Sequence, residues 1–327
     1  TSSIKKASEI YKKMEHAEHI LEKPDTYTGS TEQESTEIFV YSSEHKAIAL
    51  KTISISPGLY KCFDELLVNA HDHKQRMKKI QEDGRKHFQV TTIKVDINLD
   101  GSISFYNDGD GILIEFMEEH QMYPPELIFG SLLTSTNYDD NEEREWGGRN
   151  GYGAKLANIF SKKFIVETSC HVNKKLFSQE FRNNMNDRTS PIIKPYKGRP
   201  YTKITWLPDY ERFSMTTLSE EVKALIEKRV YDIAGITDKD TSVYLNDKLI
   251  TLPSFEKYVN LYIGGNNEVR RVFEEGPGWQ IIATSSQDDI FEQVSFVNGI
   301  STSRGGTHVD YIADQNYYWC DHHFDYL

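Results

Sequence analysis

The sequence predicts an α+β protein in which helices pack on one side of a largely antiparallel sheet. Short segments of alternating apolar and polar residues follow one another at hairpin spacing, which is typical of antiparallel strands. Two longer segments, residues 57–80 and 218–233, instead repeat apolar side chains at the period of a helix that lies on a core. A chain of 327 residues is long enough for about two domains.

The composition excludes several classes of protein. The formal net charge is −12, and this argues against a domain that coats DNA by itself, because sequence-independent DNA affinity comes mainly from Lys and Arg. No apolar run approaches membrane-spanning length, and the first residues lack a signal-peptide core. The cysteines Cys62, Cys170 and Cys320 are an odd number without metal-binding spacing. We therefore expect an intracellular protein in a reducing compartment, without a membrane partner.

The N-terminal segment predicts a helix over residues 3–22, which Pro24 and Gly29 bring to an end. This helix has few apolar residues for its length. It is either an ordinary surface helix or one that packs on a partner subunit. A strand is expected next, at residues 38–41.

The helix expected at residues 57–80 carries a pair of polar side chains that could do chemistry. Its apolar face consists of Leu59, Cys62, Phe63, Leu66, Leu67 and Ala70. Glu65 and Asn69 lie one turn apart on the border of that face. A half-sheltered carboxylate can act as a general base, and a carboxamide oxygen is a suitable ligand for Mg²⁺. Such a pair is more commonly just a solvated helix edge.

Residues 91–99 and 102–107 predict two strands joined by a tight turn at Asp100-Gly101. They lead into Asn107-Asp108-Gly109-Asp110-Gly111. Two glycines separated by one residue after a strand allow the backbone to approach a ligand or to adopt positive φ, and an ordinary turn is the alternative.

A short helix is expected at residues 125–133, followed by a cluster of small hydrogen-bonding side chains, Ser135, Thr136 and Asn137. After an acidic loop comes Gly147-Gly148-Arg149-Asn150-Gly151-Tyr152-Gly153-Ala154-Lys155, which leads into a helix. Bare backbone N–H groups, the start of a helix and two cationic side chains suit a polyphosphate. The pattern is neither a Walker A motif nor a dinucleotide fingerprint, and a lid without a ligand is the alternative.

The remaining chain is expected to supply further strands of the sheet and then to begin a second domain. Strands are expected at residues 164–169, 176–181, 201–207 and 242–245, and a helix at 218–233. From about residue 254 a second domain begins. We expect it to contain a helix at 255–263, a charged connector at 264–276, and strands at 279–283 and 291–298.

Taken together, the motifs closely resemble the N-terminal ATPase region of eukaryotic-type DNA topoisomerase II, in order and in spacing, over about residues 5–315. The motifs that carry the resemblance are Asp64-Glu65-x-x-x-Asn69, Asn107-x-Gly109-x-Gly111, residues 132–140, residues 147–155 and Ser295-Phe296-Val297-Asn298.

The resemblance implies a GHKL (Bergerat-type) ATPase fold, a two-layer mixed and largely antiparallel sheet with helices on one face, plus the start of a transducer domain. It divides the chain into an N-terminal strap (1–30), the ATPase domain (31–253), an incomplete transducer domain (254–315) and a tail unlike the family (316–327).

The resemblance also implies roles for individual residues. Glu65 is the general base and Asn69 coordinates Mg²⁺, while Asn107 contacts the adenosine moiety of ATP. The side chains of Ser135, Thr136 and Asn137 line the ribose and phosphates. The loop that closes over the triphosphate consists of Gly148, Arg149, Asn150, Gly151, Tyr152, Gly153, Ala154 and Lys155.

The family further implies a homodimer, formed through the strap and the ATPase domain, in which Tyr11 reaches the partner's nucleotide site. Packing under its own helix is the alternative for Tyr11. DNA would be a partner only of the full enzyme. The protein would be located in the nucleus if it is a cellular eukaryotic enzyme, and otherwise elsewhere inside the cell.

Three departures from the family pattern leave a second function open. The chain contains no Gln-Thr-Lys, the transducer motif whose lysine contacts the γ-phosphate, and no DNA-cleavage domains. The tail Cys320-Asp321-His322-His323 is not spaced to surround one zinc ion and is interpreted as a junction or truncation remnant.

The main hypothesis for the function is an ATP-hydrolysing dimerisation gate that is slow in isolation. The alternative is a nucleotide-binding, dimer-forming fragment with little turnover. A third interpretation is a mismatch-repair ATPase, a chaperone or a histidine kinase. It is weaker, because those proteins do not share the loop at residues 147–155 as it stands in this sequence.

Overall fold

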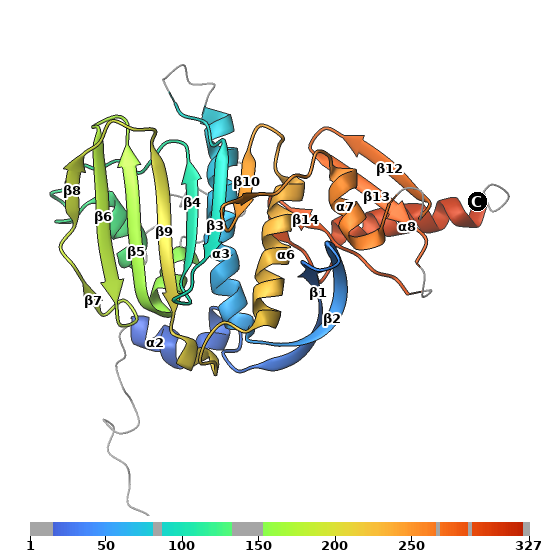
Figure 1. Cartoon of the computed structure of the whole chain (residues 1–327), viewed down its shortest axis with the longest axis horizontal. Coiled ribbons are helices and arrows are strands. Elements are labelled where there is room, and N and C mark those ends of the chain that lie inside the picture. The colour runs from blue at the N-terminus through green and yellow to red at the C-terminus, as the bar shows by residue number, and fades with distance from the viewer. Residues whose placement is uncertain (1–15, 81–86, 133–152, 266–268, 287–289, 323–327) are drawn as a thin grey trace, which may run out of the picture.

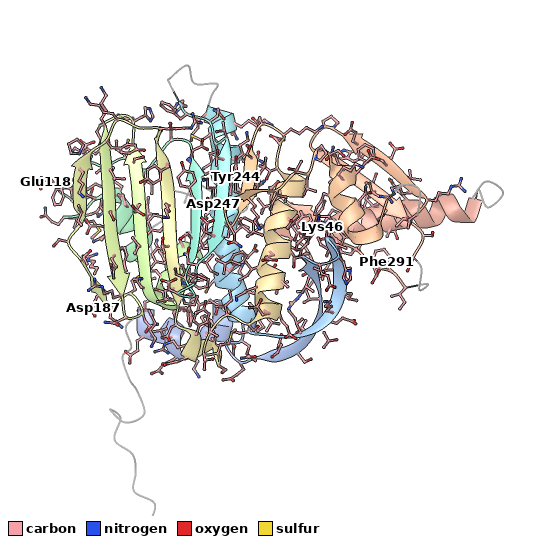
Figure 2. All side chains as sticks on the ribbon, viewed as in Figure 1. Lys46, Glu118, Asp187, Tyr244, Asp247 and Phe291 are labelled. Atoms are coloured by element: carbon pink, nitrogen blue, oxygen red, sulfur yellow. The ribbon has the colours of Figure 1, made fainter. Side chains whose placement is uncertain are left out.

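The computed structural model of the chain describes residues 16–80, 87–132, 153–265, 269–286 and 290–322, the last seven of these by their backbone alone. These residues form one large sheet with a layer of helices, a separate long hairpin and a smaller C-terminal part (Figure 1). Figure 2 shows their side chains on the ribbon in the same view.

The large sheet has nine strands in the order β11-β10-β3-β4-β9-β5-β6-β7, and β8 also pairs with β6. The strands are β3 (Thr92–Ile97), β4 (Ile103–Asp108), β5 (Ser161–Cys170), β6 (Lys175–Arg182), β7 (Asp187–Arg188), β8 (Ile192–Pro195), β9 (Tyr201–Pro208), β10 (Ser242–Leu245) and β11 (Lys248–Leu249). Strands β10 and β3 run parallel, and the other described pairs of this sheet are antiparallel. The predicted mixed, largely antiparallel sheet is therefore confirmed.

One face of the sheet is covered by helices that also contact one another, namely α3 (Pro57–Ile80), α4 (Pro124–Gly130), α5 (Gly153–Ile159) and α6 (Glu220–Ile236). The alternation along β3 shows the two faces, because Ile93 and Val95 are buried in the core while Lys94 between them is part-exposed. The indole N–H of buried Trp206 donates to the carbonyl oxygen of Ala157 at 2.9 Å, which ties β9 to α5. The predicted α+β class, with helices on one side, is confirmed.

Helix α3 has the bounds that the sequence predicts. Its six predicted apolar positions are all at most 5% exposed: Leu59, Cys62, Phe63, Leu66, Leu67 and Ala70. Helix α6 likewise buries the apolar residues expected of it, and its N-cap Ser219 accepts from the backbone N–H of Val222 at 3.2 Å.

A long hairpin, β1 (Glu34–Ser42) and β2 (Ala47–Ile55), lies apart from the large sheet and packs on α6 through Val40, Ile53 and Leu225. The sequence predicted only the middle of β1 and missed β2. Before the hairpin lie α2 (His16–Glu22) and the short 3₁₀ turn η1 (Pro24–Thr26). A second 3₁₀ turn, η3 (Tyr210–Phe213), follows β9.

The C-terminal part contains α7 (Phe255–Ile263), the hairpins β12 (Arg271–Gly276) with β13 (Trp279–Thr284) and β14 (Phe296–Val297) with β15 (Ile300–Ser301), and α8 (Thr307–His322). Two expectations were wrong here. The second half of the expected connector is strand β12, and only two residues of the expected strand at 291–298 are paired. Whether such short, exposed segments form strands depends on pairing with a neighbouring strand rather than on their local sequence pattern.

The domain boundaries remain predictions. The helix α8 runs on through residue 315, where the sequence suggested that family-like sequence ends. Among the described helices, none is both long and apolar enough to cross a membrane.

Candidate functional site

The candidate site begins on helix α3, whose buried face fixes the positions of Glu65 and Asn69. Glu65 is half-buried, with 25% of its side chain exposed, and Asn69 is exposed one turn further along. The sequence thus correctly placed both residues at the border between core and surface. The carboxylate of Glu65 forms an ion pair with Lys61 at 2.5 Å, one turn earlier on the same helix.

The pair with Lys61 was not anticipated from the sequence, although the i, i+4 spacing was visible. Burial lowers the pKa of Lys61, but the charge and hydrogen bond of Glu65 more than offset this, so that the pKa is raised. Lys61 is 47% exposed, so a solvent-screened pair of this kind contributes about 0.3–0.5 kcal/mol. The pair can therefore be broken at small cost.

The start of helix α5 lies directly against the Glu65 carboxylate. A Cβ atom on Gly153 would lie 2.1 Å from Oε2 of Glu65 and 3.1 Å from its Cβ. Only glycine fits at this position without moving the carboxylate. The chain therefore passes from the glycine-rich segment into α5 at the point where the candidate base lies.

Lys155 lies in the first turn of α5 and is 1% exposed. Burial lowers its pKa from the ordinary value of a lysine to about 8. Ala154, between Gly153 and Lys155, is part-buried and packs against the core. A largely desolvated ammonium interacts strongly with an anion brought close to it.

On the sheet side, Asn107 is the penultimate residue of strand β4 and is 7% exposed, with its amide donating to the carbonyl oxygen of Asp108 at 2.9 Å. Gly109 has φ of +105°, and a Cβ on Gly111 would lie 1.9 Å from the carbonyl oxygen of Ser169. Both glycines are therefore required by the backbone path of this turn.

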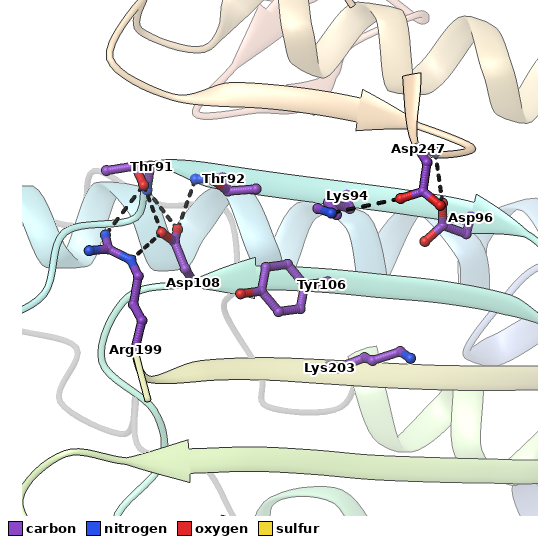
Figure 3. Close-up of a pocket in the computed structure, with 9 residues that line it drawn as sticks. All are labelled: Thr91, Thr92, Lys94, Asp96, Tyr106, Asp108, Arg199, Lys203 and Asp247. Carbon is purple, nitrogen blue, oxygen red and sulfur yellow. Dashed lines mark hydrogen bonds and ion pairs between the residues drawn. The ribbon is translucent and has the colours of Figure 1, made fainter. Parts of the chain in front are cut away.

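Asp108 anchors the turn from the opposite side, and no sequence motif indicated this. Its carboxylate accepts from the N–H groups of Thr91 and Thr92 at 2.7 and 2.8 Å, and from the Thr91 hydroxyl at 2.7 Å. Arg199 donates to it at 2.6 Å (Figure 3). Next to the glycines, Asp110 accepts from the N–H of Phe88 at 2.9 Å and lies 2.6 Å from Nδ1 of His87. The position of Asn107 is thus set by its neighbours.

A cavity of about 650 Å³ lies on the sheet face that the helices leave uncovered (Figure 3). It is lined by Thr91, Thr92, Lys94, Asp96, Tyr106, Asp108, Arg199, Lys203 and Asp247. None of these belongs to the predicted site, whose described residues are on the helical face.

Several predicted site residues lie outside the described residues. They are Tyr11, Ser135, Thr136, Asn137, Gly148, Arg149, Asn150, Gly151 and Tyr152. The described members of the predicted set fall into two groups, Glu65 with Asn69, Gly153, Ala154 and Lys155 around α3 and α5, and Asn107 at the end of β4. The described residues hold no cluster of three His, Cys, Asp or Glu side chains that could bind a metal by themselves.

Comparison with known proteins shows which family the chain resembles. No protein-family model matches the chain. It is 48% identical over 315 residues to a probable DNA topoisomerase 2 of Dictyostelium discoideum and 45% identical over 319 residues to DNA topoisomerase 2 of Arabidopsis thaliana. These matches cover 94% and 95% of this chain but 20% and 21% of the relatives, so the chain spans about a fifth of their length.

Solved structures are similar over most of their own length. The ATPase region of Saccharomyces cerevisiae topoisomerase II matches with a TM-score of 0.86 and 43% identity, over 95% of this chain and 79% of that one. The ATPase and transducer domains of DNA topoisomerase II from Balamuthia mandrillaris match with a TM-score of 0.86 and 42% identity, over 95% and 77%.

The fold, with its glycine-rich segment entering α5 beside the α3 carboxylate, defines an ATP-binding ATPase module of the type IIA topoisomerase class. The chain belongs to the DNA topoisomerase II family and corresponds to its ATPase region.

The contact between Gly153 and Glu65 can be tested by thermal unfolding. Ala has a better helix propensity than Gly, by about 1 kcal/mol in a helix interior and by less at a first position such as that of Gly153 in α5, so Gly153→Ala should be neutral or slightly stabilising wherever there is room for a methyl group. We expect Gly153→Ala to be less favourable in the unchanged chain than in a Glu65→Ala background, with a coupling of at least about 0.5 kcal/mol. Additive effects of the two substitutions would contradict the close approach.

Proposed function

We propose that this chain binds ATP with Mg²⁺ and hydrolyses it, as the ATP-operated gate of a strand-passing topoisomerase. The observation that carries the proposal is the close contact between Gly153 and the Glu65 carboxylate. This contact brings the segment proposed to hold the phosphates to the residue proposed to activate water. DNA cleavage is not proposed for this chain.

Glu65 is the proposed general base. A half-buried carboxylate can accept a proton from a water molecule placed in line with the γ-phosphate. The exposed, adjacent Lys61 can leave the carboxylate when a nucleotide arrives, because their surface pair is weak. Glu65 would thus orient and deprotonate the attacking water.

Asn69 is the proposed protein ligand of Mg²⁺. Its carboxamide is exposed one helical turn from Glu65, and an amide oxygen is among the ligands that Mg²⁺ accepts alongside water and phosphate oxygens. When bound, Mg²⁺ would neutralise charge on the phosphate oxygens.

The remaining roles follow the family pattern. Asn107 would contact the adenosine moiety, and Lys155 the β and γ oxygens. The side chains of Ser135, Thr136 and Asn137 would line the ribose and phosphates. The proposed lid over the triphosphate consists of Gly148, Arg149, Asn150, Gly151, Tyr152, Gly153 and Ala154. Supporting this, Lys155 is a buried cation close behind Gly153.

For the whole protein we propose a homodimer that closes when ATP binds, with Tyr11 of the N-terminal strap reaching the partner's nucleotide. DNA would be its substrate, and the nucleus its compartment. The support is that the relatives are topoisomerases 2 of eukaryotes such as Dictyostelium discoideum and Arabidopsis thaliana.

Substitution of Glu65 tests the hydrolytic role. Glu65→Gln keeps the shape of the side chain but removes its basicity, so we expect a loss of turnover of about 10²–10⁴-fold. Affinity for a non-hydrolysable ATP analogue should stay within about threefold. Single-turnover hydrolysis of labelled ATP and analogue titration measure the two quantities.

Two results would count against this assignment. Persistent turnover in Glu65→Gln would show that another group is the base. Analogue binding without any turnover in the unchanged chain would favour a binding-only, dimer-forming fragment.

The lowered pKa of Lys155 predicts a pH dependence of nucleotide binding. Its ammonium is charged below about pH 8 in the free protein and becomes neutral above it. Bound phosphate favours the charged form, so we expect affinity to fall as pH rises through 8 and then to level off above the higher pKa of the complex. Isothermal titration between pH 7 and about 9.5 measures this. Lys155→Met should bind more weakly and without that fall, and an unchanged pH profile would rule Lys155 out as a phosphate ligand.

Nucleotide-dependent dimerisation tests the site and the strap together. Analytical ultracentrifugation should show a shift from monomer toward dimer on adding a non-hydrolysable ATP analogue, because a ligand that binds the dimer preferentially stabilises it by mass action. Tyr11→Ala should weaken this shift while leaving Glu65-dependent hydrolysis chemistry in place. A chain that binds the analogue but stays monomeric would contradict the proposed gate.

A further inference from the structure

The β14–β15 hairpin of the C-terminal part reaches the back of helix α3, the helix that carries Glu65 and Asn69. It turns through Asn298 and Gly299, which have φ of +50° and +80°. Positive φ at both positions is typical of a tight two-residue hairpin loop. This loop contacts α3 at two places, one through an arginine and one directly.

The first contact passes through Arg229 of helix α6. Its side chain has no exposed surface, and its Nε donates to Oδ1 of Asp64 at 2.7 Å, where Asp64 is the neighbour of Glu65 on α3. Its Nη2 donates to the carbonyl oxygen of Gly299 at 2.6 Å. The guanidinium also lies over the ring of Phe296, 5.6 Å from its centre. One rigid guanidinium therefore joins α6, α3 and the hairpin.

The second contact is direct. A Cβ atom on Gly299 would lie 2.5 Å from Nδ1 of His71, so the hairpin backbone touches this α3 side chain. His71 is 3% exposed, and neither ring nitrogen has a hydrogen-bond partner among the described residues. Burial, followed by the nearby charge of Arg229, lowers its pKa to about 4, so the ring is neutral at ordinary pH.

These two contacts lie on one line of the helix, on a different side from Glu65 and Asn69. Asp64 and His71 are seven residues apart and so differ by only about 20° around the axis. Glu65 and Asn69 lie about 100° and 140° around from Asp64, between the same two levels of the helix. Whatever moves the hairpin therefore shifts or rotates the segment that carries the proposed base and magnesium ligand.

We propose that Arg229 is a positioning residue for hydrolysis, which holds α3 through Asp64 to the β14–β15 hairpin so that the hairpin sets the orientation of Glu65. This inference rests on the proposed function. Stability alone is a poor explanation for the arrangement, because an apolar replacement of a buried ion pair is often equally stable or more stable. The fixed fork of a guanidinium is suited to bonding two partners at set directions, and a lysine ammonium is not.

The proposal can be tested in the 327-residue chain with two substitutions at opposite ends of the link. Arg229→Lys keeps the charge beside Asp64 but loses the fork. Gly299→Ala keeps the guanidinium but displaces the hairpin end of the link, because a methyl group there meets His71 and is strained at a φ of +80°. Tyr262→Phe is the matched control, because it deletes a 2.8 Å hydrogen bond to Asp232 in the same α6 layer and leaves the link to Asp64 intact.

The readouts are single-turnover ATP hydrolysis, affinity for adenylyl imidodiphosphate, and the thermal midpoint. We expect both link variants to hydrolyse ATP at least about tenfold more slowly while binding the analogue within about threefold of the unchanged chain, because a small misplacement of a catalytic group costs rate more than affinity. Tyr262→Phe should lower the thermal midpoint and leave hydrolysis unchanged.

Two outcomes would overturn the proposal. If Arg229→Lys and Gly299→Ala lower only the thermal midpoint, like the control, then the link is structural and the proposed function stands. If the unchanged chain binds the analogue but does not hydrolyse ATP, the proposed function itself fails and Arg229 has no hydrolysis to position. Should Arg229→Lys fail to fold, the Gly299→Ala result decides by itself.

Discussion

Helix α3 packs one apolar face into the core between the large sheet and helix α6, and the candidate site depends on that packing. Burying a side chain such as Phe63, Leu66 or Leu67 contributes about 1.5–3 kcal/mol each. The surface pair between Lys61 and Glu65 contributes far less. The apolar face therefore decides where the helix lies, and the polar residues on its border are free to exchange partners.

Buried charges then fix α3 in its angle and register. Lys74, which is 1% exposed, binds both carboxylate oxygens of Asp240 at 2.6 Å, and Arg229 binds Asp64. The side chain of Asp240 is 66% exposed, so of these two pairs only Arg229–Asp64 is largely buried at both ends. Removal of one of its members would leave an uncompensated charge, so this contact resists displacement of the helix. Asp64 and Glu65 are adjacent yet have opposite tasks, since Asp64 is held from behind while Glu65 faces Gly153.

Prediction from sequence succeeded where a residue's environment depends on its near neighbours in the chain. The bounds of α3 and α7, the buried face of α6 and the turn between β3 and β4 follow from local periodicity and turn residues. It failed for β2 and β12. Both strands exist because a neighbouring strand pairs with them, and no local pattern records that pairing.

The same distinction applies to the site. The sequence by itself determined that Glu65 and Asn69 lie side by side at the edge of a core, and that glycines occur where the backbone must turn or approach closely. Only the tertiary structure decided that Gly153 lies on the Glu65 carboxylate, that Asp108 is bound by Thr91 and Arg199, and that Arg229 joins α3 to the β14–β15 hairpin. The physical reason is that helical periodicity relates residues one turn apart, whereas these contacts join residues far apart in sequence. Their partners are chosen by the packing of whole elements.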